Sequence, residues 1–296
     1  MSPRVCLAIA TFNRSPELFN LLQWLGTLKD QPDEVVVVDQ TPLHPSHVER
    51  FLREGGARGE FRWIRLDRPN LPTARNVAAL NCSSDVMIFI DDDTIIPEGF
   101  ITQYRRAFAE SDVAAIAGGV ISPLGFRPAI FSVNDYRSTL ESFLPKFEAW
   151  TSSFVDSVCG CNMAVRKAVM DSVGGFDRNY VGTAMYEDKD FMRRVMESGF
   201  RCEYRPEIAL VHYLAEKGGC RNNFAPWFSE FEKASPHWRY ALKFFSIGHF
   251  LRSAKVVFRS ICFRKENVLN DPLLIPVSVL SAALALGQTY RTLDVR

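Results

Sequence analysis

The chain has 296 residues, with 35 lysines and arginines against 34 aspartates and glutamates, a formal net charge of +1 and 47% hydrophobic residues. This ordinary globular composition excludes a disordered chain, a collagen-like repeat and a heavily basic protein that coats nucleic acid, so no nucleic-acid partner is expected. The length allows one large domain or two small ones.

The neutral total conceals a division of charge along the chain. Residues 1–232 contain 25 basic and 31 acidic side chains, whereas residues 233–296 contain 10 basic and 3 acidic ones. Such a shift predicts two parts with different surroundings, with a boundary near residue 232.

The cysteines and the first residues bear on the compartment. Seven cysteines without a C-x-x-C pair predict free thiols in a reducing cytosol, and Cys159 with Cys161 is only a weak metal signal. The apolar run Val5–Ala10 is too short for a secretory signal. A cytoplasmic protein is therefore expected.

The first 121 residues alternate between short apolar runs and stretches of helical periodicity. Strands are predicted over residues 5–10, 34–39, 61–66, 86–90 and 113–121. Helices are predicted from Ser15, around Val48 with an end at Gly55-Gly56, over 73–80, and from Pro97 to Phe108. This alternation predicts an α/β fold with a Rossmann-like, mostly parallel sheet flanked by helices on both faces.

The pattern loosens after this alternation. Residues 122–153 are predicted to form a long irregular segment. The segment 160–167 is expected to lead into a short helix. The pattern then predicts a turn at 174–177, a helix over 188–198 and two short strands at 202–204 and 208–211.

Three predicted strands end in polar side chains: Thr11, Asp39 and Asp91-Asp92-Asp93. The carboxyl ends of parallel strands meet at one edge of a sheet, where ligands bind. Three adjacent carboxylates need a cation or hydrogen bonds, and Mg²⁺ or Mn²⁺ shared with substrate phosphates is the usual partner. A solvated turn that caps the next helix is the alternative.

Several segments, in this order, resemble the inverting family 2 glycosyltransferases, which have the GT-A fold. They are Thr11-Phe12-Asn13-Arg14, Asp39, Asn70 with Ala74-Arg75-Asn76, Phe89-Ile90-Asp91-Asp92-Asp93, Gly160-Cys161-Asn162-Met163-Ala164, Gly174-Gly175-Phe176-Asp177, Glu187-Asp188 and His212. The resemblance covers roughly residues 4–224. It implies a catalytic domain over 1–232, with a nucleotide-sugar half over about 1–120 and an acceptor half over about 121–232, followed by a helical, basic extension over 233–296.

The resemblance also implies roles for individual residues. The nucleotide would be bound by Thr11, Phe12, Asn13, Arg14, Asp39, Asn70, Arg75, Asp91 and Asp92, with Asp39 at the base. The metal would be held by Asp93 and His212, although a lone histidine at a strand end also fits a hydrogen-bonded core residue. The acceptor and sugar side would comprise Gly160, Cys161, Asn162, Met163 and Glu187. Asp188 would be the catalytic base.

The chemistry of sugar transfer supports these expectations. A nucleoside diphosphate sugar loses a charged diphosphate, and a divalent cation on Asp93 would offset that charge as a Lewis acid. Lys217 and Arg221 are candidates to assist the diphosphate, or else surface cations. Asp188, at the start of a predicted helix, is placed to take the proton of the acceptor hydroxyl. For Glu187, matching of charge to the helix N-terminus is a sufficient explanation.

Two departures from the family pattern limit the prediction. Asp39-Gln40-Thr41-Pro42 stands where the family usually has D-D-G-S, which leaves the nucleotide open. The Q-x-x-R-W motif of processive synthases is missing, and residues 273–287 are the only long apolar run. A processive synthase is therefore not expected, and this run is too short to span a membrane.

The segment after Lys233 has helical periodicity, with Arg252, Lys255 and Arg259 on one face. It fits either a helix on an anionic membrane surface or one packed on the catalytic domain.

Taken with the resemblance, the sequence predicts a metal-dependent hexosyltransferase that uses a nucleoside diphosphate sugar and a glycan or lipid-linked acceptor. Polysaccharide synthesis at the cytoplasmic face of the membrane is the expected setting.

Two other functions stay open at this point. Asp91-Asp92-Asp93-Thr94 also fits the D-x-D-x-T signature of haloacid-dehalogenase-like phosphatases, with Asp91 as nucleophile. Those enzymes carry the signature on their first strand, whereas three predicted strands precede it here. A non-catalytic sugar- or lipid-binding module is the second alternative.

Overall fold

The computed structural model describes residues 2–121, 153–154 and 159–220, together with residues 236, 239, 240, 243 and 244. The chain divides into two units. The first comprises Met1–Phe176 and Asp188–Gly219, and the second comprises Asp177–Glu187 and the chain from Cys220 onward. The predicted irregular segment, apart from Ser153, and nearly all of the basic extension lie outside the described residues.

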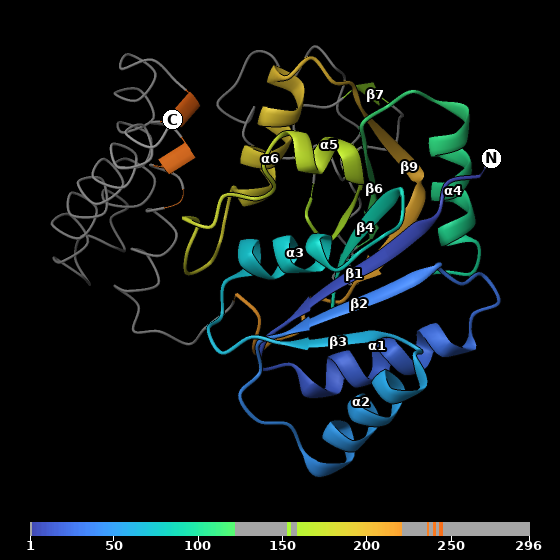
Figure 1. The fold of residues 1–296 in the computed structure, drawn as a ribbon, viewed down its shortest axis with the longest axis vertical. Coiled ribbons are helices and arrows are strands. Elements are labelled where there is room, and N and C mark those ends of the chain that lie inside the picture. Colours follow the sequence, from blue (N-terminus) through green and yellow to red (C-terminus); the bar gives the residue numbers. More distant parts are fainter. Residues whose placement is uncertain are drawn as a thin grey trace, which may run out of the picture. The chain divides into compact units, whose positions relative to one another are not determined.

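The described part of the first unit is built around one nine-stranded sheet (Figure 1). Its strands are β1 Val5–Thr11, β2 Glu34–Asp39, β3 Arg62–Arg65, β4 Val86–Asp91, β5 Thr94–Ile95, β6 Ala115–Ile121, β7 Ser153–Phe154, β8 Asn162–Arg166 and β9 Cys202–His212. They are arranged in the order β3-β2-β1-β4-β8-β6-β9-β5, and β7 pairs with β9. The pairs among β3, β2, β1 and β4 are parallel, whereas β8 runs antiparallel between β4 and β6.

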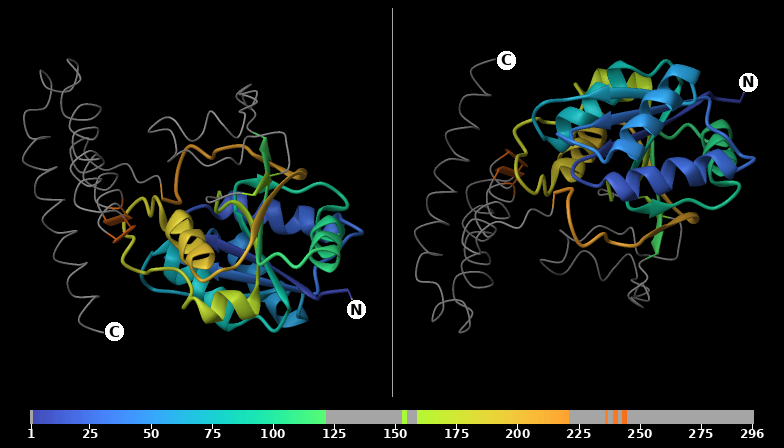
Figure 2. Two further views of the ribbon diagram at one scale, coloured as in Figure 1. Left: turned by 90° about the horizontal axis from the view of Figure 1, so that it is seen from above. Right: turned by 90° about the horizontal axis from the view of Figure 1, so that it is seen from below.

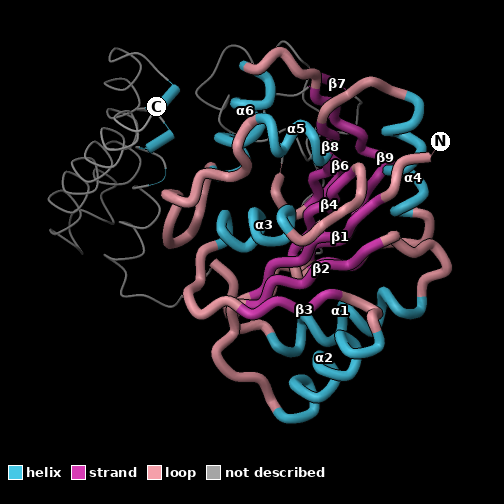
Figure 3. The backbone as a smooth tube through the Cα atoms, viewed as in Figure 1, coloured by secondary structure: helices cyan, strands magenta, loops and turns pink. Residues whose placement is uncertain are grey.

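Helices cover both faces of this sheet, as the tube and the views from above and below show (Figures 2 and 3). They are α1 Ser15–Thr27, α2 Ser46–Arg58, α3 Leu71–Leu80, α4 Phe100–Glu110, α5 Lys167–Ser172 and α6 Glu187–Glu197. Along β1, Val5, Leu7 and Ile9 pack in one apolar cluster with α1, α2 and α4. Cys6 and Ala8 pack in the other cluster with α3, α5 and α6. Burial on both faces explains why the strands are continuous apolar runs.

The expected α/β architecture is confirmed, with local differences. The second helix runs through Gly55-Gly56 to Arg58, and its C-cap is Gly59, whose φ of 74° is left-handed. A Cβ at Gly55 would lie 2.5 Å from Phe61 Cε1, so this glycine allows close packing and does not end the helix. The helix expected from Pro97 begins at Phe100.

Two strands were misjudged from the sequence. Residues 162–166 form β8, where the sequence predicted only an approach to a helix. The two short strands expected after residue 201 are one strand, β9, whose pairing with β6 shifts in register between Gly118 and Gly119. A bulge of this kind interrupts the side-chain alternation, which explains the apparent break in the sequence pattern.

None of the helices in the described part of the chain is long and apolar enough to cross a bilayer.

Candidate active site

Three parallel strands bring the predicted polar residues to one edge of the sheet. Thr11 at the end of β1 pairs in register with Asp39 at the end of β2. On the other side of β1, Ala10 is in register with Asp91 at the end of β4. The register thus places the opening loop, Asp39 and the aspartate triplet side by side, as the sequence predicted for strand ends.

The aspartates of the triplet differ in environment. The Asp91 side chain is 30% exposed, whereas those of Asp92 and Asp93 are buried. Asp92 accepts hydrogen bonds from Thr11 Oγ1 at 2.7 Å and from Arg14 Nη1 at 2.8 Å. Burial raises the pKa of Asp92 to about 7, although both partners act in the opposite direction. The middle aspartate is therefore part of a buried network.

Asp93 is held by three groups from other parts of the chain. Arg14 Nη1 lies 3.0 Å from Asp93 Oδ2, and the backbone N–H of Ala215 donates to the same oxygen at 2.9 Å. His212 Nε2 lies 3.0 Å from Asp93 Oδ1. Burial favours the neutral carboxyl, but His212 and Arg14 outweigh burial and lower the pKa of Asp93. Asp93 is thus kept ionised.

Asp91, Asp93 and His212 form a group that could hold a metal ion. One ligand atom from each residue lies within 4.8 Å of the other two. Two carboxylates and an imidazole suit a first-row divalent cation such as Mn²⁺. The residues present therefore fit the expected metal.

Arg14 is clamped by a segment that follows β9. Its Nε donates to the Lys217 carbonyl at 3.0 Å, and the Gly219 N–H donates to the Phe12 carbonyl at 2.7 Å. A Cβ at Gly219 would lie 2.8 Å from Arg14 Cζ, and a Cβ at Gly218 would lie 2.6 Å from Arg14 Cγ. Only glycine fits this close approach. The sequence prediction missed this glycine pair, although two adjacent glycines were a visible signal.

Lys217 enters this arrangement through its backbone, whereas the sequence pointed to its side chain, which is exposed. Arg221, the other predicted cation, lies outside the described residues.

Within the opening loop, Asn13 donates its N–H to Thr41 Oγ1 at 2.9 Å. That bond ties the loop after β1 to the loop after β2.

Asp39 is completely buried and accepts hydrogen bonds on both oxygens. Thr41 N–H donates to Oδ1 at 2.8 Å, Trp63 Nε1 donates to Oδ2 at 3.0 Å, and His44 Nε2 lies 2.7 Å from Oδ2. His44 Nδ1 in turn lies 2.8 Å from Ser15 Oγ. Neither His44 nor Trp63 was predicted, and no local motif marks them, because the contacts are made between different elements.

The unusual Gln40 links β2 to α3. Its Oε1 accepts the N–H of Asn70, while Asn70 Oδ1 caps α3 by accepting from Thr73 N at 2.8 Å. The residue that departs from the family pattern therefore helps to fix the helix that carries Arg75. Asn70 acts here as an N-cap.

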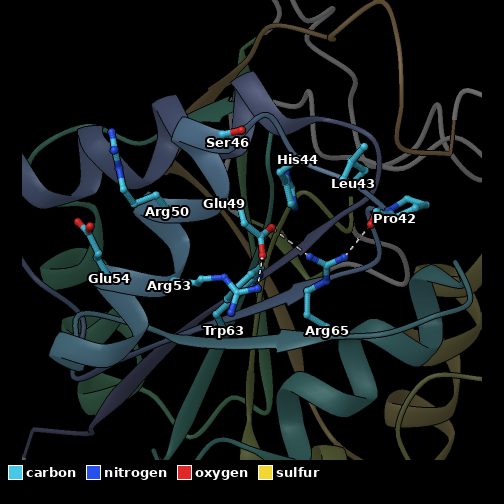
Figure 4. Close-up of a pocket in the computed structure, with 10 residues that line it drawn as sticks. All are labelled: Pro42, Leu43, His44, Ser46, Glu49, Arg50, Arg53, Glu54, Trp63 and Arg65. Carbon is cyan, nitrogen blue, oxygen red and sulfur yellow. Dashed lines mark hydrogen bonds and ion pairs between the residues drawn. The ribbon is translucent and has the colours of Figure 1, made fainter.

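An open pocket of about 950 Å³ lies beside this network, between α2, β3 and residues 42–44 (Figure 4). Glu49 pairs with Arg53 at 2.8 Å and with Arg65 at 3.4 Å, and the close-up shows it between the two guanidinium groups. His44 and Trp63 also line this pocket. The groups that hold Asp39 thus separate it from this surface.

Arg75 connects the aspartate triplet to the predicted base. The arginine is buried on α3 and lies 3.6 Å from Asp91 Oδ1. Its Nη2 donates to the Gly160 carbonyl at 3.0 Å, and the Gly160 N–H donates to Asp188 Oδ2 at 3.0 Å. Asp91, Arg75, Gly160 and Asp188 therefore form one continuous chain of contacts. Glu187, the residue before Asp188, is buried and belongs to the second unit.

The other residues predicted on the acceptor side lie in the interior. Asn162 Nδ2 donates to the carbonyls of Gly119 at 2.8 Å and Ile208 at 2.9 Å, and its Oδ1 accepts from Tyr104 Oη at 2.7 Å. The Met163 side chain packs in the apolar core, and Cys161 is 2% exposed. Gly160 thus contacts Asp188, whereas the side chains of Cys161, Asn162 and Met163 are buried in the interior of the first unit.

The comparisons with known proteins agree with this geometry. The family model described as Glycosyl transferase family group 2 matches residues 86–247. Pre-mycofactocin glycosyltransferase of Mycobacterium tuberculosis (strain H37Rv) is 26% identical over 208 residues, which is 70% of this chain and 42% of that protein. Succinoglycan biosynthesis protein ExoM of Rhizobium meliloti (strain 1021) is 26% identical over 214 residues, 70% of this chain and 65% of that protein. The chain thus spans less than two thirds of either relative.

Two solved structures share the fold. Mannosyltransferase PcManGT from Pyrobaculum calidifontis, in complex with GDP-Man and Mn²⁺, has a TM-score of 0.59 at 18% identity, over 100% of this chain and 81% of that one. GalNAc-T7 with UDP, GalNAc and Mn²⁺ has a TM-score of 0.56 at 12% identity, over 87% and 57%. The phosphatase alternative is set aside, since the triplet begins at the last residue of β4, the fourth strand along the chain, in a GT-A sheet. The chain belongs to glycosyl transferase family group 2 and has the GT-A fold.

Proposed function

We propose that this chain is a metal-dependent, inverting glycosyltransferase that moves a sugar from a nucleoside diphosphate sugar to a hydroxyl of a glycan or lipid-linked acceptor. The observation that carries the proposal is the contact chain from Asp91 through Arg75 and Gly160 to Asp188. It links the carboxylate proposed as the base to the group proposed to hold the metal, which supports a single site with a donor end and an acceptor end. Succinoglycan biosynthesis by one relative supports a role in polysaccharide synthesis.

The donor half of the site would use the opening loop and the strand ends. We assign the nucleotide to Thr11, Phe12, Asn13, Arg14, Asn70 and Asp91, at the edge of the sheet where β2 ends in Asp39. Arg75 is buried beside Asp91, where its fixed charge would stabilise a diphosphate that gains negative charge. Asp93 and His212 would hold a divalent cation, which would act as a Lewis acid on the diphosphate.

The acceptor half would depend on Asp188. An inverting transfer is a single displacement, in which the acceptor hydroxyl attacks the anomeric carbon, the bond from that carbon to the diphosphate oxygen breaks, and the hydroxyl proton passes to the base. Asp188 Oδ2 accepts from Gly160 N–H, and Oδ1 accepts from Lys189 N–H at 2.8 Å. These bonds would hold the side chain in place for a role as general base, while each oxygen retains a lone pair.

A thermal-shift screen of UDP, GDP and dTDP sugars, each with Mn²⁺, Mg²⁺ or a chelator, tests the proposal. A donor that binds only the native state raises the melting temperature. We expect one nucleotide class to stabilise the protein and to require the cation. The anomeric configuration of the transferred sugar, measured by NMR, tests inversion. A protein that responds to no nucleotide with either cation would overturn the assignment.

A further inference from the structure

Two cysteine thiols flank the glycine that contacts the proposed base. Cys159 Sγ and Cys161 Sγ lie 3.2 Å apart. Cys161 is 2% exposed, whereas Cys159 is partly exposed. A disulfide has an S–S distance of about 2.05 Å, so a bond would form if the sulfurs approached by roughly 1 Å.

Gly160, between the two cysteines, has little freedom to absorb such a movement. Its N–H donates to Asp188 and its carbonyl accepts from Arg75, each at 3.0 Å. A Cβ at Gly160 would lie 2.5 Å from Arg75 Nη2, so the backbone already packs closely against the guanidinium. A disulfide between the flanking sulfurs would enclose this residue in a small ring and restrict its backbone torsions. The same torsions aim both hydrogen bonds.

We propose that Cys159 and Cys161 form a reversible disulfide that switches transfer off by displacing Gly160 from Asp188 and Arg75. The oxidant is a hydroperoxide. The Cys159 thiolate attacks the peroxide, the O–O bond breaks, and a sulfenic acid and water result. Cys161 sulfur then attacks Cys159 sulfur, the S–O bond breaks, and the Cys161 proton leaves with the hydroxide as water. Two thiols and one hydrogen peroxide thus give one disulfide and two waters.

The surroundings assign the order of the two steps. Contact with Cys159 and burial raise the pKa of the Cys161 thiol well above its ordinary value. Cys161 therefore stays protonated and reacts second, while the partly exposed Cys159 meets the oxidant first. A strained disulfide between near neighbours is readily reduced, so a dithiol restores the two thiols.

The effect on transfer rests on the proposed function, but the formation of the disulfide does not. Full-length protein is treated with hydrogen peroxide, then mapped by peptide mass spectrometry and assayed before and after dithiothreitol. We expect a Cys159–Cys161 disulfide and full recovery of turnover after reduction. Before reduction, turnover should fall on the order of 100-fold, because a displacement of about 1 Å at reacting groups costs that much.

Cys159→Ser should retain turnover and resist peroxide. Cys82→Ser is the matched control, because Cys82 lies beside Cys6 in a second thiol pair away from Gly160, and this variant should remain sensitive. Absence of the 159–161 disulfide, or full turnover of protein that carries it, would overturn the proposal. If reduced protein transfers no sugar but mass mapping finds the disulfide, the proposed function fails while the redox site stands.

Discussion

Arg14 Nη1 lies 3.0 Å from Asp93 Oδ2, so a guanidinium occupies one side of the carboxylate assigned to the metal. The same nitrogen lies 2.8 Å from Asp92. Arg14 is therefore the internal counter-charge of two buried aspartates. Replacing Arg14 should therefore have a larger effect on stability than replacing a surface arginine.

Replacement of Arg14 by methionine should destabilise the metal-free protein and increase its response to metal. Two buried carboxylates would lose their cation, which costs on the order of 3 kcal/mol of unfolding free energy. Mn²⁺ should then raise the melting temperature of Arg14→Met more than that of the wild type, as measured by calorimetry with Mn²⁺ or EDTA. The exposed Arg53→Met is the control. Equal stabilities of Arg14→Met and wild type in EDTA would contradict this role.

Asp188→Asn should remove transfer and preserve donor binding. The asparagine oxygen can accept from only one of the Gly160 and Lys189 N–H groups, and the side chain cannot accept a proton from an acceptor hydroxyl. Loss of a general base lowers turnover by about 100- to 10,000-fold. Steady-state turnover and the nucleotide-induced thermal shift measure the two effects separately. Glu197→Gln, at the other end of α6, serves as the control, and unchanged turnover of Asp188→Asn would exclude it as the base.

The sequence was sufficient where the signals are local. The runs of Val35–Val38 and Val86–Ile90 are apolar throughout and end in carboxylates, which located two strand ends before any contact was known. The expected order of motifs then identified the family. The parallel pairing that joins these ends follows from chain alternation alone.

The sequence was insufficient where a role depends on distant partners. β8 begins with Asn162 and ends with Arg166, so its pattern is too short and polar to indicate a buried strand. Its existence depends on pairing with β4 and β6. Similarly, His44 and Trp63 meet at Asp39 from another loop and strand. Such contacts leave no periodic trace in one sequence.

Asn162 gives a test that separates packing from acceptor binding. Asn162→Leu would leave the Gly119 and Ile208 carbonyls and the Tyr104 hydroxyl without this partner. Each orphaned buried group costs about 1–3 kcal/mol, so we expect a loss of at least 3 kcal/mol in urea unfolding. The exposed Asn20→Leu should stay within about 0.5 kcal/mol of wild type. A stable Asn162→Leu protein with a changed acceptor KM would favour the acceptor role.

Membrane association of the basic extension stays a prediction, since most of residues 233–296 lie outside the described part of the chain. Each lysine or arginine near an anionic surface contributes about 1 kcal/mol. Neutralising Arg252, Lys255 and Arg259 to glutamine should therefore weaken binding to phosphatidylserine vesicles roughly 100-fold in a sedimentation assay. Replacing Arg53, Arg58 and Arg106, which are exposed on the first unit, is the charge-matched control. Equal binding by both triple variants would exclude this surface.

Within the second unit, Asp177 pairs with Arg239 at 2.7 Å and with Lys243 at 3.1 Å. Burial favours the neutral acid, but the two cations outweigh it and hold the pKa of Asp177 well below its usual range. A depressed pKa in the folded state adds stability above the unfolded pKa of about 3.9, and this stability is lost as the pH falls below that value.

Asp177→Asn should therefore destabilise the protein most at neutral pH. The Arg239 side chain is 3% exposed, and an unpaired buried cation costs about 3 kcal/mol. Urea unfolding at pH 7, 5 and 3.5 should show a full difference from wild type at the two higher values and a smaller one at pH 3.5. Asp171→Asn breaks the more exposed pair with Lys167 and should cost at most about 0.5 kcal/mol. A difference for Asp177→Asn that grows as the pH falls would contradict the sign of the pKa shift.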